Sequence, residues 1–187
     1  MALLLGLGCR ATSLDPQVLT PRSVAQKSLA NARTGHSATV IADGASRQTV
    51  LFVGGGGSPC SSEMYQLGQT SELVNTDSDC RVGHTATLLA DRSVLIAGGV
   101  TSLRTTADVL KSAEVFSPRS EEMKSTGSLE TARYNHNATF LGDGTVLITG
   151  GFGNEIEGKT AIDSAELYDP KKGVFIDLGR MNFARAG

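Results

Sequence analysis

The sequence predicts an all-β fold built from repeated antiparallel strands, and three observations support this. Glycine is abundant, at 22 of 187 residues, while long stretches of Ala, Leu, Glu and Lys with a helical period are missing. Short stretches alternate between polar and apolar residues, as strands with one buried face do. The same pattern then recurs three times along the chain, which indicates a repeat architecture.

Each repeat opens with Arg-x-x-His. The three opening segments are "RTGHSATVIADGASRQTVLFVGG" from Arg33, "RVGHTATLLADRSVLIAGG" from Arg81 and "RYNHNATFLGDGTVLITGG" from Arg133. Each continues to a second shared piece: "SSEMY" from Ser61, "SAEVFSP" from Ser112 and "SAELYDP" from Ser164. A spacing of about 50 residues suits one four-stranded blade of a β-propeller. The differences in length fall between the strand-like pieces, where loops on a constant scaffold vary.

The first two strands of a repeat follow from its opening segment. "HTATLLA" alternates small or polar with apolar residues and predicts the first strand. A hairpin turn is expected at Asp91-Arg92, and at Asp143-Gly144 in the third repeat. "VLIAGG" then predicts a short strand buried on both faces, and its paired glycines indicate close backbone approach or a positive φ.

The last two strands follow from the second shared piece. Ser-Ala-Glu-Val/Leu-Phe/Tyr alternates and predicts a third strand that stops at Pro118 or Pro170. A weaker fourth strand would contain Met123 or lie around Phe175. The expected fold is therefore a partial β-propeller of about three four-stranded antiparallel blades.

The double glycines, the Glu-x-aromatic and Asp-Pro that follow them, and the Arg-x-x-His opening resemble kelch repeats, most closely those of the bacterial, galactose-oxidase-like type. The likeness covers residues 28–187. It places blades near 33–80, 81–132 and 133–184, and a fourth would begin at 185. The sequence contains no tryptophan, which many kelch units carry on the last strand, and Met123 and Phe175 take that place.

Kelch propellers usually close with more than three blades. The resemblance therefore implies either a fragment of a longer reading frame or identical arcs that associate through their blade edges into a ring.

Residues 1–9 look like a leader, and 10–27 form a polar linker. "LLLGLGC" resembles the end of a bacterial lipoprotein signal peptide, in which Cys9 would carry the lipid, although Gly6 stands where Leu, Val or Ile is usual. An ordinary secretory leader or an apolar N-terminus remains the alternative. The chain is thus expected to be exported to a bacterial cell envelope or the extracellular space. Cys60 and Cys80 would then form a disulfide or remain two buried thiols.

Charge and motif context exclude several classes of function. The net charge is −2 and there is no dense block of Lys and Arg, so no basic surface for binding nucleic acid is expected. Contact with a membrane is expected only through the lipid. "GNEIEGKT" matches a phosphate-loop template, but a strand rather than a helix is expected after Thr160, and Glu155 and Glu157 would repel phosphate. In "NTDSDC", Asn75, Asp77 and Asp79 have the spacing of a calcium loop, but Cys80 and Ala86 stand where such a loop needs glycine and glutamate. The segment is therefore expected to be a solvated acidic loop.

The repeat residues are expected to be structural. A catalytic or metal site gathers different residues at one point, whereas equivalent residues of successive blades are spread around a ring. The copper site of galactose oxidase relatives does not carry over, because Tyr65 and Tyr168 are equivalent strand residues and no histidine remains for copper. No catalytic residue, metal or cofactor is therefore expected. The structural set is Arg33, His36, Gly54, Gly55 and Glu63; Arg81, His84, Gly98, Gly99 and Glu114; and Arg133, His136, Gly150, Gly151 and Glu166.

The segments after the double glycines, 100–111 and 152–163, do not repeat, and propellers bind partners with such loops. The expected function is a non-enzymatic binding module for a protein or glycan, with contacts from Arg104, Lys111, Glu155, Glu157 and Lys159. Two alternatives remain open. The chain would be part of a galactose-oxidase-like or glycan-processing enzyme whose active residues lie beyond residue 187, or a structural arc that assembles with itself.

Overall fold

The structure is a computed structural model that describes residues 28–42, 48–56, 61–66, 71–74, 80–103, 107–153 and 160–187. Within these ranges the regular elements are twelve β-strands, which form three separate four-stranded sheets. All strand pairs are antiparallel. Across the described part of the chain, no helix is long and apolar enough to cross a membrane.

Each sheet is one blade, and its strands follow one another in chain order. Blade 1 contains β1 (Ser37–Ala42), β2 (Gln48–Val53), β3 (Ser62–Gln66) and β4 (Glu72–Val74). Blade 2 contains β5 (Thr85–Leu88), β6 (Val94–Ala97), β7 (Ala113–Ser117) and β8 (Glu122–Ser125). Blade 3 contains β9 (Asn137–Phe140), β10 (Val146–Thr149), β11 (Ser164–Asp169) and β12 (Val174–Arg180).

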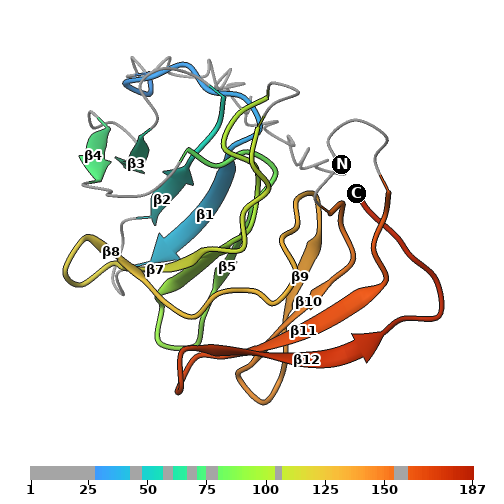
Figure 1. Cartoon of the computed structure of the whole chain (residues 1–187). Coiled ribbons are helices and arrows are strands. Elements are labelled where there is room, and N and C mark those ends of the chain that lie inside the picture. Colours follow the sequence, from blue (N-terminus) through green and yellow to red (C-terminus); the bar gives the residue numbers. More distant parts are fainter. Residues whose placement is uncertain are drawn as a thin grey trace, which may run out of the picture.

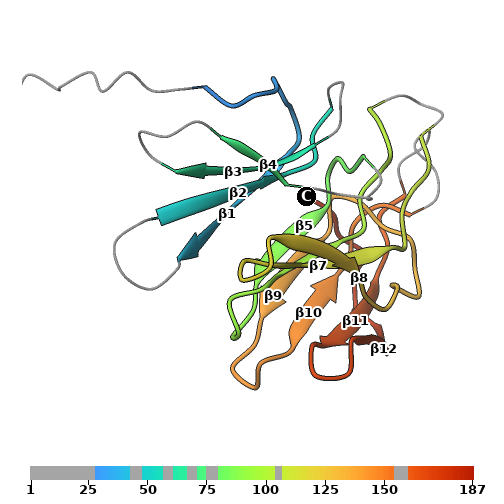
Figure 2. The same ribbon diagram turned by 90° about the vertical axis from the view of Figure 1, so that its left-hand side faces the viewer.

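The blades are arranged as an arc around the first strand of each sheet. β1 contacts β5, and β5 contacts β9, while β4, β8 and β12 lie at the periphery (Figure 1). Figure 2 shows the blades in sequence, with blade 1 above and to the left of blades 2 and 3. The predicted fold class, an all-β partial propeller of about three four-stranded antiparallel blades, is confirmed.

The hairpin turns form where the sequence predicts them, and a carboxylate organises each one. Asp91 Oδ1 accepts hydrogen bonds from Ser93 N (3.0 Å) and Ser93 Oγ (2.6 Å). Asp143 Oδ1 accepts the same two bonds from Thr145, at 3.0 and 2.6 Å. The turn between β5 and β6 holds Arg92 at a φ of 72°. The carboxylate therefore substitutes for a backbone acceptor in each turn.

The second strand of blade 2 shows why its sequence is apolar throughout. Val94 and Ile96 belong to the core between blades 1 and 2, together with Leu51 and Phe116. The alternate residues, Leu95 and Ala97, belong instead to the core between blades 2 and 3, together with Val146, Ile148 and Tyr168. β6 is therefore buried on both faces, which removes the usual polar alternation. Full burial of each large aliphatic side chain contributes roughly 1.5–3 kcal/mol.

A third apolar cluster lies at the end of the blades from which the long loops leave. Val82, Val100 and Tyr134 form its buried centre, and Val109 and Phe152 pack against it. Isolated bridges join Val82 to Val100 and Tyr134 to Phe152. The bases of the loops after β6 and β10 are therefore packed against the opening segments of blades 2 and 3.

Candidate functional site

Each blade contains one buried arginine that binds the double-glycine segment and the third strand of its own blade. Arg133 Nη1 donates to the carbonyls of Gly150 (2.9 Å) and Ser164 (3.2 Å). Arg133 Nη2 donates to Ser164 Oγ (2.8 Å) and pairs with Glu166 Oε1 (2.7 Å). The Arg133 side chain is 0% exposed and that of Glu166 is 1% exposed. A charged pair this deeply buried requires these further hydrogen bonds.

The other two arginines make equivalent contacts. Arg81 binds the carbonyls of Gly98 and Ser112, both at 3.0 Å, and lies 3.4 Å from Glu114. Arg33 binds the carbonyls of Gly54 (2.7 Å) and Ser61 (2.6 Å) and pairs with Glu63. The structure thus brings together the arginine, first glycine and glutamate that the sequence singles out in each repeat.

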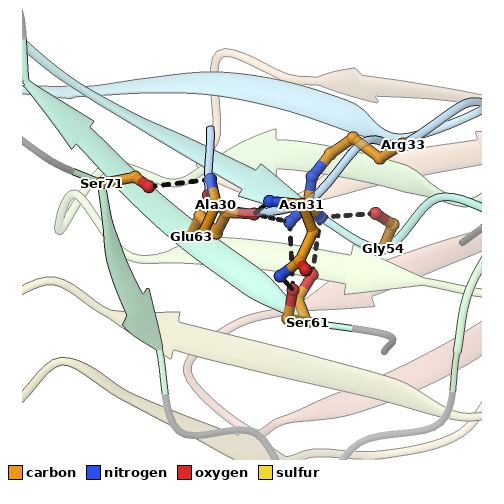
Figure 3. Close-up of polar contacts among 7 residues, drawn as sticks. All are labelled: Ala30, Asn31, Arg33, Gly54, Ser61, Glu63 and Ser71. Carbon is orange, nitrogen blue, oxygen red and sulfur yellow. Dashed lines mark hydrogen bonds and ion pairs between the residues drawn. The ribbon is translucent and has the colours of Figure 1, made fainter. Parts of the chain in front are cut away.

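The glutamates of blades 1 and 3 also hold the segment that opens their own blade. Glu63 accepts hydrogen bonds from Ala30 N (2.7 Å) and Asn31 N (3.2 Å), and Figure 3 shows these bonds converging on its carboxylate. Burial alone would raise the pKa of Glu63, but hydrogen bonds from Ala30 N–H, Arg33 and Ser71 outweigh it and lower that pKa. Glu166 accepts equivalent bonds from Glu130 N (2.8 Å) and Thr131 N (3.1 Å).

The second glycine of each pair connects its blade to the opening segment of the next repeat. Gly55 N donates to Arg81 O (2.8 Å), and Gly99 N donates to Arg133 O (2.9 Å). Gly151 N donates in the same way to Arg185 O (2.9 Å). The Arg185 carbonyl therefore contacts blade 3 as the Arg81 and Arg133 carbonyls contact blades 1 and 2.

Two histidines lie between blades and bind the first strand of the preceding blade. His84 Nε2 lies 2.8 Å from Ser37 Oγ, and His136 Nε2 lies 2.9 Å from Thr85 Oγ1. His36 is exposed and its ring lies 5.6 Å from that of Phe52. Burial, with the charge of Arg81, lowers the pKa of His84 to about 4, and burial with Arg133 lowers that of His136 to about 3. Both buried rings are therefore neutral at pH 7.

The histidines, acids and cysteines do not assemble into a metal centre where the structure describes them. Across the described residues, no group of three or more His, Cys, Asp or Glu side chains could hold a metal ion. His84 and His136 lie in different blade interfaces, and each has a hydroxyl partner. This arrangement uses them to join blades.

A chain of backbone hydrogen bonds joins the repeats at a position that the sequence analysis missed. Gly83 N donates to Gly35 O (3.4 Å), Asn135 N to Gly83 O (2.8 Å) and Gly187 N to Asn135 O (3.0 Å). All four residues have a positive φ, between 48° and 92°. The available signal was the recurrence of Gly or Asn two residues after each repeat arginine, because these residue types tolerate that conformation best.

Several predicted site residues lie outside the described residues. Lys111 is described and exposed, and its carbonyl accepts a hydrogen bond from Leu129 N (2.9 Å). Cys80 is disulfide-bonded to a partner outside the described residues, so its pairing with Cys60 stays a prediction, as does the lipid on Cys9. The predicted site residues outside the described ranges are Cys9, Cys60, Arg104, Glu155, Glu157 and Lys159.

The two buried histidines predict a loss of stability in mild acid. Below a pKa of about 6.5, histidines in the unfolded chain bind protons, whereas His84 and His136 stay neutral down to about 4 and about 3. Acid therefore favours unfolding, by about 1.4 kcal/mol per pH unit for each histidine within that window. We expect the free energy of unfolding, measured by urea titration, to fall between about pH 6.5 and 5.

His136→Gln is the variant that isolates this effect, since Gln does not titrate and can still reach Thr85. Its stability should fall less steeply with acid than that of the wild type. The matched control is His36→Gln, which removes an exposed imidazole at the equivalent position of blade 1. Equal slopes for His136→Gln and the wild type would contradict the buried neutral state of His136.

Comparison with known proteins finds kelch proteins over part of the chain. Kelch-like protein 9 of Mus musculus is 28% identical over 88 residues, which are 47% of this chain and 14% of that protein. Kelch-like protein 13 of Mus musculus is also 28% identical over 88 residues, 47% of this chain and 13% of that protein. Kelch-like protein 13 of Homo sapiens is 27% identical over 88 residues, with the same two shares. The matches therefore cover only a small part of each relative's length.

No protein-family model matches the chain. The kelch-like matches nevertheless agree with the four-stranded antiparallel sheets. Together they support a kelch-type repeat and a partial kelch-type β-propeller of about three blades.

Proposed function

We propose that this chain is a non-enzymatic binding module that contacts a protein through the loops between the second and third strands of its blades. The observation that carries the proposal is that these loops leave the same end of the blades from a rigid base. The described ends of the β6–β7 and β10–β11 loops both lie on the upper side of Figure 1, away from the hairpin turns. Variable loops on such a base suit recognition of a partner.

The rigid base consists of the contacts around the double glycines. Arg81 and Arg133 bind the carbonyls of Gly98 and Gly150, at the points where the two loops begin. Bridges from Val100 to Val109 and from Phe152 to Ala161 close the loops a few residues further on. The loops therefore start from ordered positions, which lowers the entropic cost of binding.

The β6–β7 loop presents two side chains suited to a contact. Leu103 is 64% exposed and leans toward blade 1, where a Cβ added at Gly56 would lie 2.8 Å from its Cδ1. Lys111 is exposed at the end of the same loop. An exposed leucine and a cation on one loop suit a protein surface better than a glycan, and a glycan remains the alternative ligand.

The test is a selection of displayed peptides on the immobilised protein, with a glycan array as the second arm. We expect enriched peptides to bind the Leu103→Ser/Lys111→Ala variant at least about tenfold more weakly, because interface energy is concentrated in a few side chains. Arg119→Ala, an exposed change in the turn between β7 and β8 at the other end of blade 2, should leave binding unchanged. If the peptides bound the Leu103→Ser/Lys111→Ala and Arg119→Ala variants with equal affinity, the loop site would be contradicted. Binding only to glycans would favour the alternative ligand.

A further inference from the structure

A cavity of about 500 Å³ lies at the end of the blades opposite the long loops. It is formed by three turns: that between β5 and β6, that between β9 and β10, and that between β11 and β12. These turns lie together on the lower side of Figure 1. The volume falls in the range of small-molecule sites. The cavity is therefore separate from the loop surface and needs its own explanation.

Two carboxylates at the cavity are held in place by their own turns. Asp91 and Asp143 both line it, and each uses Oδ1 to accept a backbone N–H and a hydroxyl from the residue two positions on. Neither residue has an ion-pair partner in the part of the chain that the structure describes. The bonds from Thr145 hold the pKa of Asp143 below its ordinary value, so this group is ionised at neutral pH.

The third carboxylate at the cavity is already compensated. Asp169 Oδ1 accepts a hydrogen bond from Lys171 N (3.0 Å), and its Oδ2 lies 3.3 Å from Lys172 Nζ. Lys171 also lines the cavity and its side chain is exposed. The uncompensated charge is therefore that of Asp91 and Asp143, opposed only in part by Lys171.

The remaining wall of the cavity is apolar. Leu89 is 5% exposed and belongs to the core between blades 2 and 3, and Pro170 lies in the turn between β11 and β12. A ligand for this cavity needs a cationic group for the two carboxylates and an apolar part for this wall. An anion would be repelled by Asp91 and Asp143, and a purely apolar molecule would leave both carboxylates unpaired.

We propose that this cavity binds an aliphatic ammonium group. The hydrocarbon stem packs against Leu89 and Pro170, and the ammonium group is shared by the carboxylates of Asp91 and Asp143. The same group is available from a free aliphatic diamine and from a lysine side chain on another protein. Long aliphatic cations bury their stems and keep their charged ends near water, so a cavity with an apolar wall and exposed carboxylates suits both sources.

The test is a titration of the ¹⁵N-labelled 187-residue chain with 1,5-diaminopentane, in which amide chemical shifts are followed by NMR. We expect saturable shifts at Ala90, Gly144 and Lys171 and none at Val100, which lies at the opposite end of the blades in the apolar cluster with Val82 and Tyr134. Asp91→Asn/Asp143→Asn should weaken binding about tenfold, since Asn keeps the Oδ1 acceptor that the turns need but removes the charge. Lys171→Gln should strengthen binding severalfold, because Lys171 is the only cationic side chain among the described residues that line the cavity.

One matched control variant separates this site from general effects of charge, and a peptide tests the source of the ammonium group. Asp177→Asn removes an exposed carboxylate that accepts one backbone hydrogen bond (2.9 Å, from Gly179 N) and does not line the cavity, so it should leave binding unchanged. Acetyl-Gly-Lys-Gly-amide tests the lysine source, and saturation by this peptide as well as by the diamine would support a protein partner. Shifts that do not saturate, equal shifts with 1,5-pentanediol, or unchanged affinity in the double Asn variant would overturn the proposal.

Discussion

Replacing Arg133 by Met should lower the free energy of unfolding by about 3–5 kcal/mol, the usual cost of removing one partner from a buried ion pair. Arg133 is fully buried, and its loss leaves the buried carboxylate of Glu166 with the amides of Glu130 and Thr131 as its hydrogen-bond donors among the described residues. The carbonyls of Gly150 and Ser164 lose a donor at the same time. Urea denaturation followed by far-UV circular dichroism measures the change.

Two further variants make the origin of this loss visible. Arg133→Met/Glu166→Gln should be more stable than Arg133→Met alone, because Gln can accept the two amide hydrogen bonds without a buried charge. Arg180→Met removes an exposed pair with Asp163 (3.5 Å, with the arginine side chain 80% exposed) and should cost less than about 1 kcal/mol. If the double variant were less stable than Arg133→Met, the cost would not come from an uncompensated carboxylate.

The blades themselves could be predicted from the sequence. Strand number, hairpin turns and blade order follow from a pattern repeated three times, since each strand's alternation is local. The apolar "VLIA" segment was predicted to be buried on both faces, and β6 has this arrangement because two blades pack against it. Met123 and Phe175, predicted to substitute for tryptophan, pack against the two inter-blade cores.

Contacts between residues far apart in the sequence could not be predicted in the same way. The bonds from Ala30 and Asn31 to Glu63 join residues 33 and 32 positions apart, and nothing in the local pattern specifies those donors. The series of backbone hydrogen bonds through Gly35, Gly83 and Asn135 has only a weak sequence signal, because one of these residues is not glycine. The cavity lined by Asp91 and Asp143 is formed by turns of two different blades, so it exists only once those blades are packed together.

The second large loss of stability is expected at a double glycine, where one blade packs against the opening segment of the next. Gly98→Ala should lower the free energy of unfolding by about 4 kcal/mol, from two costs that add. Gly98 has a φ of +63°, which costs an L-residue about 1–2 kcal/mol. A Cβ there would also lie 2.5 Å from Arg133 O and 2.9 Å from His136 Cε1. Overpacking of this kind typically costs about 1–3 kcal/mol.

Two other glycines in the same protein separate the two costs. Gly144 has a φ of +89° with nothing within 4 Å of an added Cβ, so Gly144→Ala should show the backbone cost alone, about 1–2 kcal/mol. Gly142 has neither a positive φ nor a neighbour, so Gly142→Ala should be neutral or slightly stabilising. The clash at Gly98 is with the opening segment of blade 3, so only that variant measures packing between blades. If Gly98→Ala and Gly144→Ala had equal stabilities, blades 2 and 3 could not approach each other as closely as the bond from Gly99 N to Arg133 O requires.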